Sequence, residues 1–126
     1  MGQERRNNPR FPVAENAYVA FGGETSIVGP AYDISLTGVA FEYICDGSTC
    51  KGTFPVLELF VLNSSFKLHN MPCGIVYDTR VSGPGPQAAL SKIMVRRCGL
   101  QFVHPKPQHI EQIRHFLQQH TFGPQQ

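Results

Sequence analysis

Short segments of alternating apolar and polar residues, separated by turn-forming residues, constrain the fold of this chain more than any other feature. In residues 39–44, Val39, Phe41 and Tyr43 would share one face of an extended strand, with the intervening side chains on the other. Such segments predict strands at residues 13–21, 25–33, 39–44, 54–62, 66–69, 73–81 and 93–103. Short strands punctuated by turns favour an antiparallel barrel or sandwich, so the chain should be mainly β.

Glycine and proline mark the places where this strand pattern is interrupted. Gly29 and Pro30 fall inside the second predicted strand, and because proline cannot donate to a strand ladder, they suit an edge or a bulge. A turn is predicted at residues 35–38. Longer loops are expected at residues 45–53 and 82–91, which contain glycine and few apolar side chains.

The C-terminal part of the chain has helical periodicity. Four apolar side chains recur on one face at helical spacing: Ile110, Ile113, Phe116 and Leu117. Pro107 suits a first helical turn and Gly123 and Pro124 would stop the helix, which is predicted at residues 107–120. A helix with one apolar face must cover an apolar surface, so we expect it across a barrel mouth or flank.

The length and charge of the chain limit its organisation and its partners. The chain has 126 residues, which is the usual length of one domain. We therefore expect a flexible basic arm at residues 1–11 and one barrel domain with its closing helix at residues 12–122. The formal net charge of +2 is too mild for nucleic-acid binding through bulk charge. The arm is locally basic, because it holds Arg5, Arg6 and Arg10, and such an arm points to an anionic ligand.

No segment is typical of membrane insertion or export. The most apolar run, residues 56–62, is short and includes Glu58. The N-terminus is polar and lacks the apolar core of a signal peptide. We therefore expect a cytoplasmic protein that is not inserted in a membrane.

Cysteines and histidines are the remaining candidates for special chemistry. The chain has four cysteines: Cys45, Cys50, Cys73 and Cys98. Because there is no secretory signal, we interpret them as free thiols, with a redox pair or a metal site as alternatives. The only close pair has a spacing that is loose for zinc. The histidines of the predicted helix, His109, His115 and His120, are expected on its solvated side, so no metal site is predicted.

The basic arm carries the first of two candidate binding motifs. Arg6 and Arg10 are four positions apart, and Pro9 stiffens the chain just before the second arginine. When extended, four residues span up to ~13 Å. The two guanidinium groups can therefore grip different parts of one anionic ligand, each with two parallel hydrogen bonds.

The second motif places Asp33, Ser35 and Gly38 within six residues. Asp33 is an acceptor, Ser35 can donate, and Gly38 can take a positive φ and let a ligand ring approach the backbone. Asp33 and Ser35 would point the same way in an extended segment. Each motif alone is typical of a solvated tail or an ordinary turn. However, Asp33 follows Arg10 by 23 residues, which suits a hairpin return and predicts that the motifs lie side by side.

Together, these segments resemble the signature motifs of the PilZ domain family. Residues 6–10 (RNNPR) are similar to its Arg-x-x-x-Arg motif, and residues 33–38 (DISLTG) to its Asp/Asn-x-Ser-x-x-Gly motif. Residues 98–103 (CGLQFV) are similar to its closing Gly-x-x-Phe strand. The resemblance covers nearly the whole chain and implies an antiparallel PilZ-type β-barrel of six to seven strands with a C-terminal α-helix.

The resemblance implies a non-catalytic receptor for the bacterial second messenger cyclic di-GMP, without a metal or other cofactor. The ligand-binding residues that it implies are Arg5, Arg6, Arg10, Asp33, Ser35 and Gly38. An aspartate can accept both N1–H and N2–H of guanine, and arginines suit its phosphates and its base faces. Binding would order the arm of a monomer or weak dimer. Ordering of the arm would change the surface of the receptor, and a separate effector protein would then bind to this surface or dissociate from it. The resemblance implies motility or biofilm regulation as the output.

Three other functions are compatible with parts of the sequence. A PilZ-fold adaptor that does not bind nucleotide would usually lack one of the two motifs. A hydrolase is disfavoured, because Ser35 is not in a Gly-x-Ser-x-Gly elbow and Asp33 is too close to it to orient a histidine. Single-stranded nucleic-acid binding would need aromatic and basic residues interleaved on one strand face.

Three further residues are considered as neighbours of the site. Tyr77 is a candidate for stacking on the ligand, whereas Arg96 and Arg97 are expected on a solvated strand edge.

Overall fold

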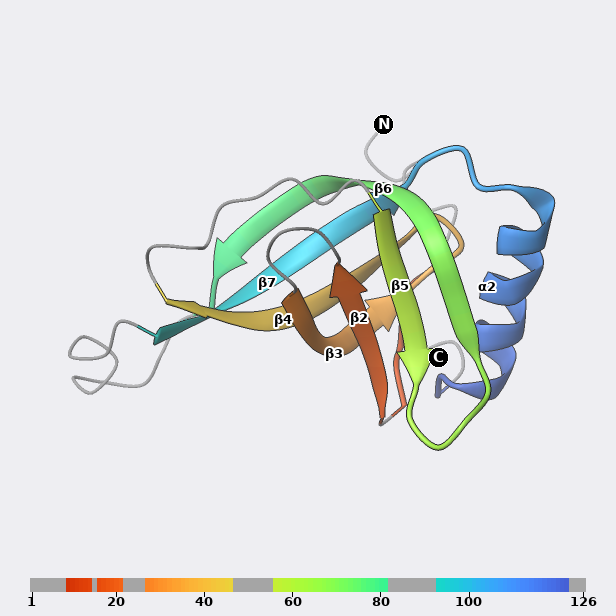
Figure 1. Ribbon diagram of the computed structural model, residues 1–126, viewed down its shortest axis with the longest axis horizontal. Coiled ribbons are helices and arrows are strands. Elements are labelled where there is room, and N and C mark those ends of the chain that lie inside the picture. The colour runs from red at the N-terminus through yellow and green to blue at the C-terminus, as the bar shows by residue number, and fades with distance from the viewer. Residues whose placement is uncertain (1–8, 15, 22–26, 47–55, 82–92, 123–126) are drawn as a thin grey trace.

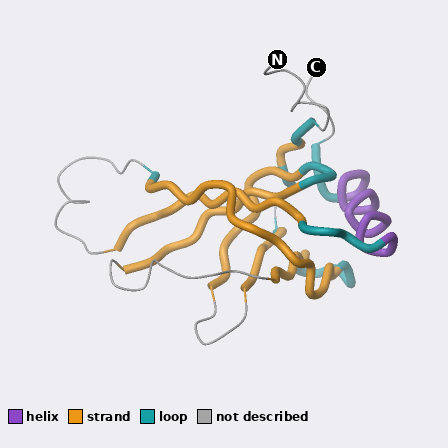
Figure 2. The backbone as a smooth tube through the Cα atoms, turned by 90° about the horizontal axis from the view of Figure 1, so that it is seen from above, coloured by secondary structure: helices purple, strands orange, loops and turns teal. Residues whose placement is uncertain are grey.

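The computed structural model describes residues 9–14, 16–21, 27–46, 56–81 and 93–122 of the 126. They form the strands and helix labelled in Figure 1: β1 (Phe11–Pro12), β2 (Ala17–Phe21), β3 (Ile27–Ile34), β4 (Gly38–Asp46), β5 (Val56–Val61), β6 (Lys67–Arg80), β7 (Ile93–Phe102) and α2 (Pro107–Gln119). The strands wrap around one core, and α2 lies at one end of them in both views (Figures 1 and 2).

The sheet closes on itself, which confirms the predicted antiparallel barrel with a C-terminal helix. Its strand order is β1-β3-β2-β5-β6-β7-β4, and a further pairing between β3 and β4 joins the two sides. The six strands from β2 to β7 thus form a closed barrel, with β1 as a short extra strand on β3. Closure pairs the backbone groups that an open sheet would leave at its edges.

Alternation along β4 places every second side chain in the barrel interior. Val39, Phe41 and Tyr43, which are predicted to share one face, are all buried. They belong to a single core that also includes apolar side chains of β2, β3, β5, β6, β7 and α2. Burying one such side chain stabilises the fold by roughly 1.5–3 kcal/mol, so the core supplies the main driving force for closure.

Strand β6 corrects the prediction of two separate strands at residues 66–69 and 73–81. The chain runs through Asn70 and Pro72 as one strand of 14 residues (Figure 1). Asn70 has a φ of 51°, which asparagine tolerates, so the strand bends there without ending. The first half of β6 pairs with β5 and the second half with β7. One bent strand therefore joins two parts of the barrel wall.

The predicted strand at residues 13–21 is shorter in the structure. Asn16 has a φ of 77°, β2 begins only after it, and β1 forms separately upstream. Between them, Val13 makes an isolated antiparallel bridge with Thr121, just beyond the end of α2. The chain that enters the barrel is therefore tied to the C-terminal end of the helix.

Strand β3 is irregular next to Gly29 and Pro30, where its sequence predicts an edge or a bulge. It pairs with β2 through residues 27–30 and then with β4, where the register shifts between Ala31 and Asp33 as in a β-bulge. Gly29 lies so close to β4 that a Cβ atom there would collide with the carbonyl oxygen of Glu42. Glycine at this position allows β3 to cross from one partner strand to the other.

Helix α2 begins at Pro107, as predicted, and buries Ile113 and Phe116 against the barrel. His109 differs from the prediction of a solvated position, because it is buried and its Nδ1 accepts the Lys106 N–H at 3.1 Å. This bond satisfies one of the backbone donors at the start of the helix. Within the described ranges, no helix combines the length and apolarity needed to cross a membrane.

Replacing Gly29 with alanine should destabilise the barrel, because the added Cβ meets backbone rather than a movable side chain. We expect Gly29→Ala to lower the free energy of unfolding in urea by about 1–3 kcal/mol. Gly74→Ala is the matched control: a Cβ there would have no other atom within 4 Å, and stability should change by about 0.5 kcal/mol or less. Equal effects at both positions would contradict a tight contact between β3 and β4.

Candidate functional site

Arg10 and Asp33, one residue of each predicted motif, meet on the outer surface of the barrel. Pairing of β1 with β3 sets Pro12 opposite Asp33, and Arg10 reaches the same carboxylate. The Nε and Nη2 atoms of Arg10 both lie 2.7 Å from Asp33 Oδ1. The two side chains are 41% and 22% exposed, so this ion pair contributes only about 0–1 kcal/mol. It places Arg10 beside the turn without locking it there.

Ser35 holds the turn that follows Asp33. It is only 1% exposed, and its Oγ lies 3.1 Å from Thr37 Oγ1 and accepts the Thr37 N–H at 3.1 Å. The Ser35 N–H in turn donates to the Gly38 carbonyl. The strand ends at Ile34, so the extended segment on which the expected common direction depended does not continue through Ser35. Asp33 binds Arg10, whereas the Ser35 hydroxyl lies at hydrogen-bond distance from Thr37.

Gly38 is needed for a reason other than the predicted one. Its φ lies outside the left-handed region, so the turn does not require glycine for its backbone conformation. Instead, a Cβ atom at Gly38 would collide with the carbonyl oxygen of Leu100 on β7. The missing side chain allows β4 to start against β7 directly after the turn.

A row of residues across four strands extends from Asp33. Asp33 on β3 lies opposite Ala40 on β4, which in turn lies opposite Gly99 on β7. Tyr77 on β6 completes the row, and its ring packs on Gly99, where a Cβ would collide with it. Much of this ring remains accessible, since Tyr77 is 41% exposed. Burial and then the charge of Asp33 raise the pKa of Tyr77, while Arg10 opposes the shift, so these side chains interact across the row.

Arg97 borders the same row and does not lie on a solvated edge, so that prediction is wrong. It is on β7, which runs between β4 and β6. Its Nε lies 2.9 Å from Glu42 Oε2, and its guanidinium lies 4.1 Å from the centre of the Tyr32 ring. The hydrogen bond to Glu42 raises the pKa of Arg97, so the group stays charged. The strand register of β7 and the contact with the Tyr32 ring place Arg97 beside the site. The spacing of residues in the sequence does not reveal either of them.

Arg96 belongs to a separate network and likewise contradicts the predicted edge position. Its Nε lies 2.8 Å from Asp78 Oδ1, while the hydroxyl of the buried Tyr43 donates to Asp78 Oδ2 at 2.8 Å. Burial and the hydrogen bond to Asp78 raise the pKa of Tyr43, so its hydroxyl remains a donor. Both carboxylate oxygens are thus engaged, and the network stabilises the barrel rather than offering a ligand site.

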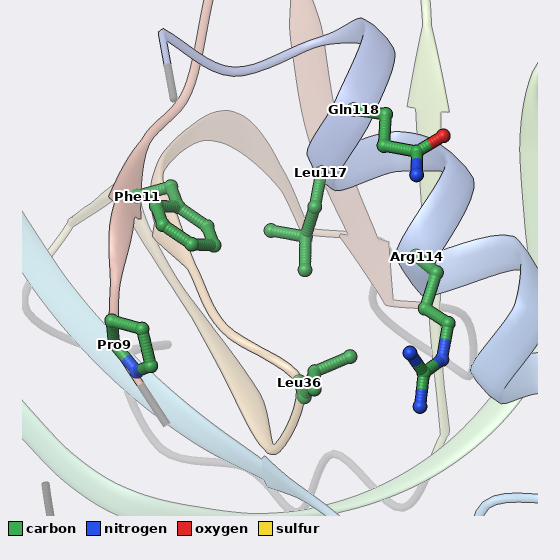
Figure 3. Close-up of a pocket in the computed structure, with 6 residues that line it drawn as sticks. All are labelled: Pro9, Phe11, Leu36, Arg114, Leu117 and Gln118. Carbon is green, nitrogen blue, oxygen red and sulfur yellow. The ribbon is translucent and has the colours of Figure 1, made fainter. Parts of the chain in front are cut away.

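A groove beside the turn was not apparent from the sequence (Figure 3). It has a volume of about 280 Å³ and is lined by Pro9, Phe11, Leu36, Arg114, Leu117 and Gln118. These residues belong to the arm, the turn and α2, which are far apart in the sequence. Local patterns carry no signal for a feature that only tertiary contacts create.

Several predicted residues lie outside the described part of the chain, among them Arg5, Arg6 and Cys50. Within the described part, no group of three or more His, Cys, Asp or Glu side chains is placed to hold a metal ion. Cys73 and Cys98 are both buried, and the thiol of Cys98 is free, which confirms the prediction of a free thiol at that position.

The stability of the protein should depend on pH in a way that reveals the burial of the Cys98 thiol. Burial raises its pKa to about 12, so above about pH 9 the unfolded chain loses a proton that the folded chain retains. Stability should therefore fall as the pH rises through this window. In urea unfolding under reducing conditions, the stability advantage of the wild type over Cys98→Ala should shrink by about 1–3 kcal/mol between about pH 8 and pH 11.

Cys73→Ala serves as the comparison, because burial raises the pKa of Cys73 to about 11 and the effect should have the same sign but a smaller size. A stability difference between wild type and Cys98→Ala that does not change with pH would contradict the burial of this thiol.

The fold and the site define a small closed β-barrel in which Arg10 meets Asp33 at the start of an Asp-x-Ser-x-x-Gly segment. A family model described as the PilZ domain matches residues 4–119. The chain therefore belongs to the PilZ domain family, which confirms the resemblance seen in the sequence. No curated protein matches the chain.

Solved structures of similar fold agree with this assignment. The PilZ domain of YcgR from Escherichia coli with c-di-GMP is 13% identical, with a TM-score of 0.64 over 87% of this chain and 86% of that one. YcgR from Escherichia coli in complex with c-di-GMP is also 13% identical, with a TM-score of 0.61 over 88% of this chain and 43% of that one.

A third similar structure is MrkH, described as a c-di-GMP-dependent transcription regulatory factor. It is 13% identical, with a TM-score of 0.65 over 90% of this chain and 50% of that one. The chain thus spans half or less of the two longer proteins, YcgR and MrkH. At this identity the likeness shows the fold.

Proposed function

We propose that this protein is a non-catalytic receptor for cyclic di-GMP. The proposal rests on one observation: Arg10 and Asp33, one from each motif, meet on the outer face of the barrel. A guanidinium and a carboxylate side by side complement a ligand that has both phosphates and guanine edges. Membership of the PilZ family and the structural likeness to proteins solved with c-di-GMP support it.

Asp33 is proposed to select guanine. Both contacts from Arg10 go to Oδ1, and within the described residues Oδ2 has no hydrogen-bond partner. A guanine edge offers two adjacent N–H donors and would engage both carboxylate oxygens, whereas adenine cannot donate in this way. Arg10 would then move to a phosphate or to the base. Because the exposed ion pair is weak, this exchange costs little free energy.

The other motif residues keep a place in the proposed site. Arg5 and Arg6 are assigned to the phosphates or to stacking on guanine, for which the arginine fork and plane are suited. Ser35 and Gly38 are assigned to the turn that presents Asp33. The hydroxyl of Ser35 is already bonded to Thr37, so this role replaces the direct donation expected from the sequence.

Ligand binding is proposed to hold the arm against the barrel as an order–disorder switch. A separate effector protein in the cytoplasm would read the changed surface, with the receptor acting as a monomer or weak dimer. Hydrolysis of the ligand is not proposed, because the Ser35 hydroxyl bonds to Thr37 and not to a histidine.

Calorimetric titration with cyclic di-GMP tests this function. Arg6→Ala and Arg10→Ala should each weaken binding by about 10- to 100-fold, because a hydrogen bond to a charged group is worth about 1.5–3 kcal/mol. Arg80→Ala, which removes an exposed arginine on β6, should leave the affinity unchanged. No heat with the wild type would favour a PilZ-fold adaptor, and equal binding of cyclic di-AMP would contradict the role of Asp33.

Tyr77 should contribute its ring rather than its hydroxyl. Tyr77→Phe should bind cyclic di-GMP within about threefold of the wild type, whereas Tyr77→Ala should bind about tenfold more weakly, since base–aromatic stacking is worth ~1–3 kcal/mol. Circular dichroism of both variants checks that the barrel is intact. An equal loss in the two variants would assign the contact to the hydroxyl instead.

A further inference from the structure

The groove beside the turn has the size and lining of a docking site for a side chain of another protein. Its apolar lining consists of Pro9, Phe11, Leu36 and Leu117. Figure 3 shows Phe11, Leu36 and Leu117 directed into one common space. The volume of about 280 Å³ is at the small end of typical binding sites and is sufficient for one or two aliphatic side chains.

The rim of this groove carries a positive charge. Arg114 on α2 is exposed, and no carboxylate of the described residues lies within ion-pair distance of it. The amide of Gln118, one helical turn further along, adds hydrogen-bonding groups on the same rim. An apolar floor beside an arginine complements an apolar side chain with a carboxylate next to it, because arginine binds a carboxylate through two parallel bonds.

We propose that this groove binds a segment of an effector protein that inserts a leucine-sized side chain and sets a neighbouring carboxylate on Arg114. The apolar contact supplies the affinity, since burying one such side chain is worth roughly 1.5–3 kcal/mol. The ion pair at the rim supplies the preference for acidic partners, because a like charge at the same place would be repelled.

Two walls of the groove also belong to the proposed ligand site. Pro9 and Phe11 directly flank Arg10, and Leu36 directly follows Ser35 in the turn. The third wall, α2, is anchored in the core by its buried side chains. A ligand that draws Arg10 away from Asp33 is therefore expected to shift Pro9, the wall residue that precedes β1, while Phe11 stays paired with β3. This coupling rests on the proposed function, whereas the docking site itself does not.

Amide NMR of the full chain tests the docking site with defined probes. The capped tetrapeptide Glu-Leu-Leu-Glu should give saturable shifts at Leu36 and Leu117, and capped Lys-Leu-Leu-Lys and Glu-Ser-Ser-Glu should bind at least about tenfold more weakly. Arg114→Glu should reverse the preference between the acidic and basic leucine peptides. Arg80→Glu, a charge reversal on exposed β6 surface, should leave it unchanged.

Calorimetry with cyclic di-GMP separates this proposal from the proposed function. Arg114→Glu should bind cyclic di-GMP as the wild type does, and saturating cyclic di-GMP should change the affinity for Glu-Leu-Leu-Glu by about fivefold or more. Peptide binding without cyclic di-GMP binding would overturn the receptor function and leave the docking site. Cyclic di-GMP binding with an unchanged peptide affinity would overturn the coupling.

Three results would overturn the docking site itself. The first is the absence of saturable shifts at the groove, and the second is equal affinity for the acidic and basic leucine peptides. The third is a groove that binds something other than the peptide. A second copy of the chain would be shown by self-association that Arg114→Glu abolishes, and a membrane surface by binding to phosphatidylglycerol vesicles in place of the peptide. Thermal unfolding of Arg114→Glu, which should match that of the wild type, excludes a folding defect.

Discussion

The pairing of β3 with three other strands is the constraint on which the rest of the structure depends. It pairs with β2 through residues 27–30, then with β4 across a bulge, and at its end with β1. This crossing joins the two sides of the sheet into a barrel and depends on the close approach at Gly29. The same crossing carries β1 to Asp33 and thereby brings Arg10 to the carboxylate. Closure of the fold and assembly of the candidate site therefore have one physical origin.

The candidate site lies on the outer face of the barrel wall, since the interior is filled by one apolar core. On that outer face, the small residues Ala40 and Gly99 leave space that the Tyr77 ring partly covers. The arm contributes to two neighbouring surfaces: Arg10 contacts Asp33, while the residues on either side of it line the groove against α2. Because the ion pair of Arg10 is exposed and weak, a change of partner at Arg10 can affect both surfaces while β1 remains paired with β3.

Most of the fold could be predicted because alternation and helical periodicity report which side of an element is buried. Strand boundaries were less accurate where asparagine and proline permit more than one outcome. At Asn70 the chain bends and β6 continues, whereas the strand predicted at residues 13–21 begins only after Asn16. Local conformational preference does not separate these cases, since strand partners on either side decide whether pairing continues. Likewise, Arg97 could be recognised as a cation but not as the partner of Glu42.

The sequence by itself determined a mainly β chain ending in an amphipathic helix, and it determined which groups of the site carry charge, among them Arg10 and Asp33. Only the tertiary structure decided that Ser35 holds the turn, that Tyr77 packs on Gly99 and that a groove lies against α2. The reason is physical. Residue type and spacing specify the available chemistry and the buried face of each element, but contacts between distant residues depend on strand register and barrel closure, which only the folded chain establishes.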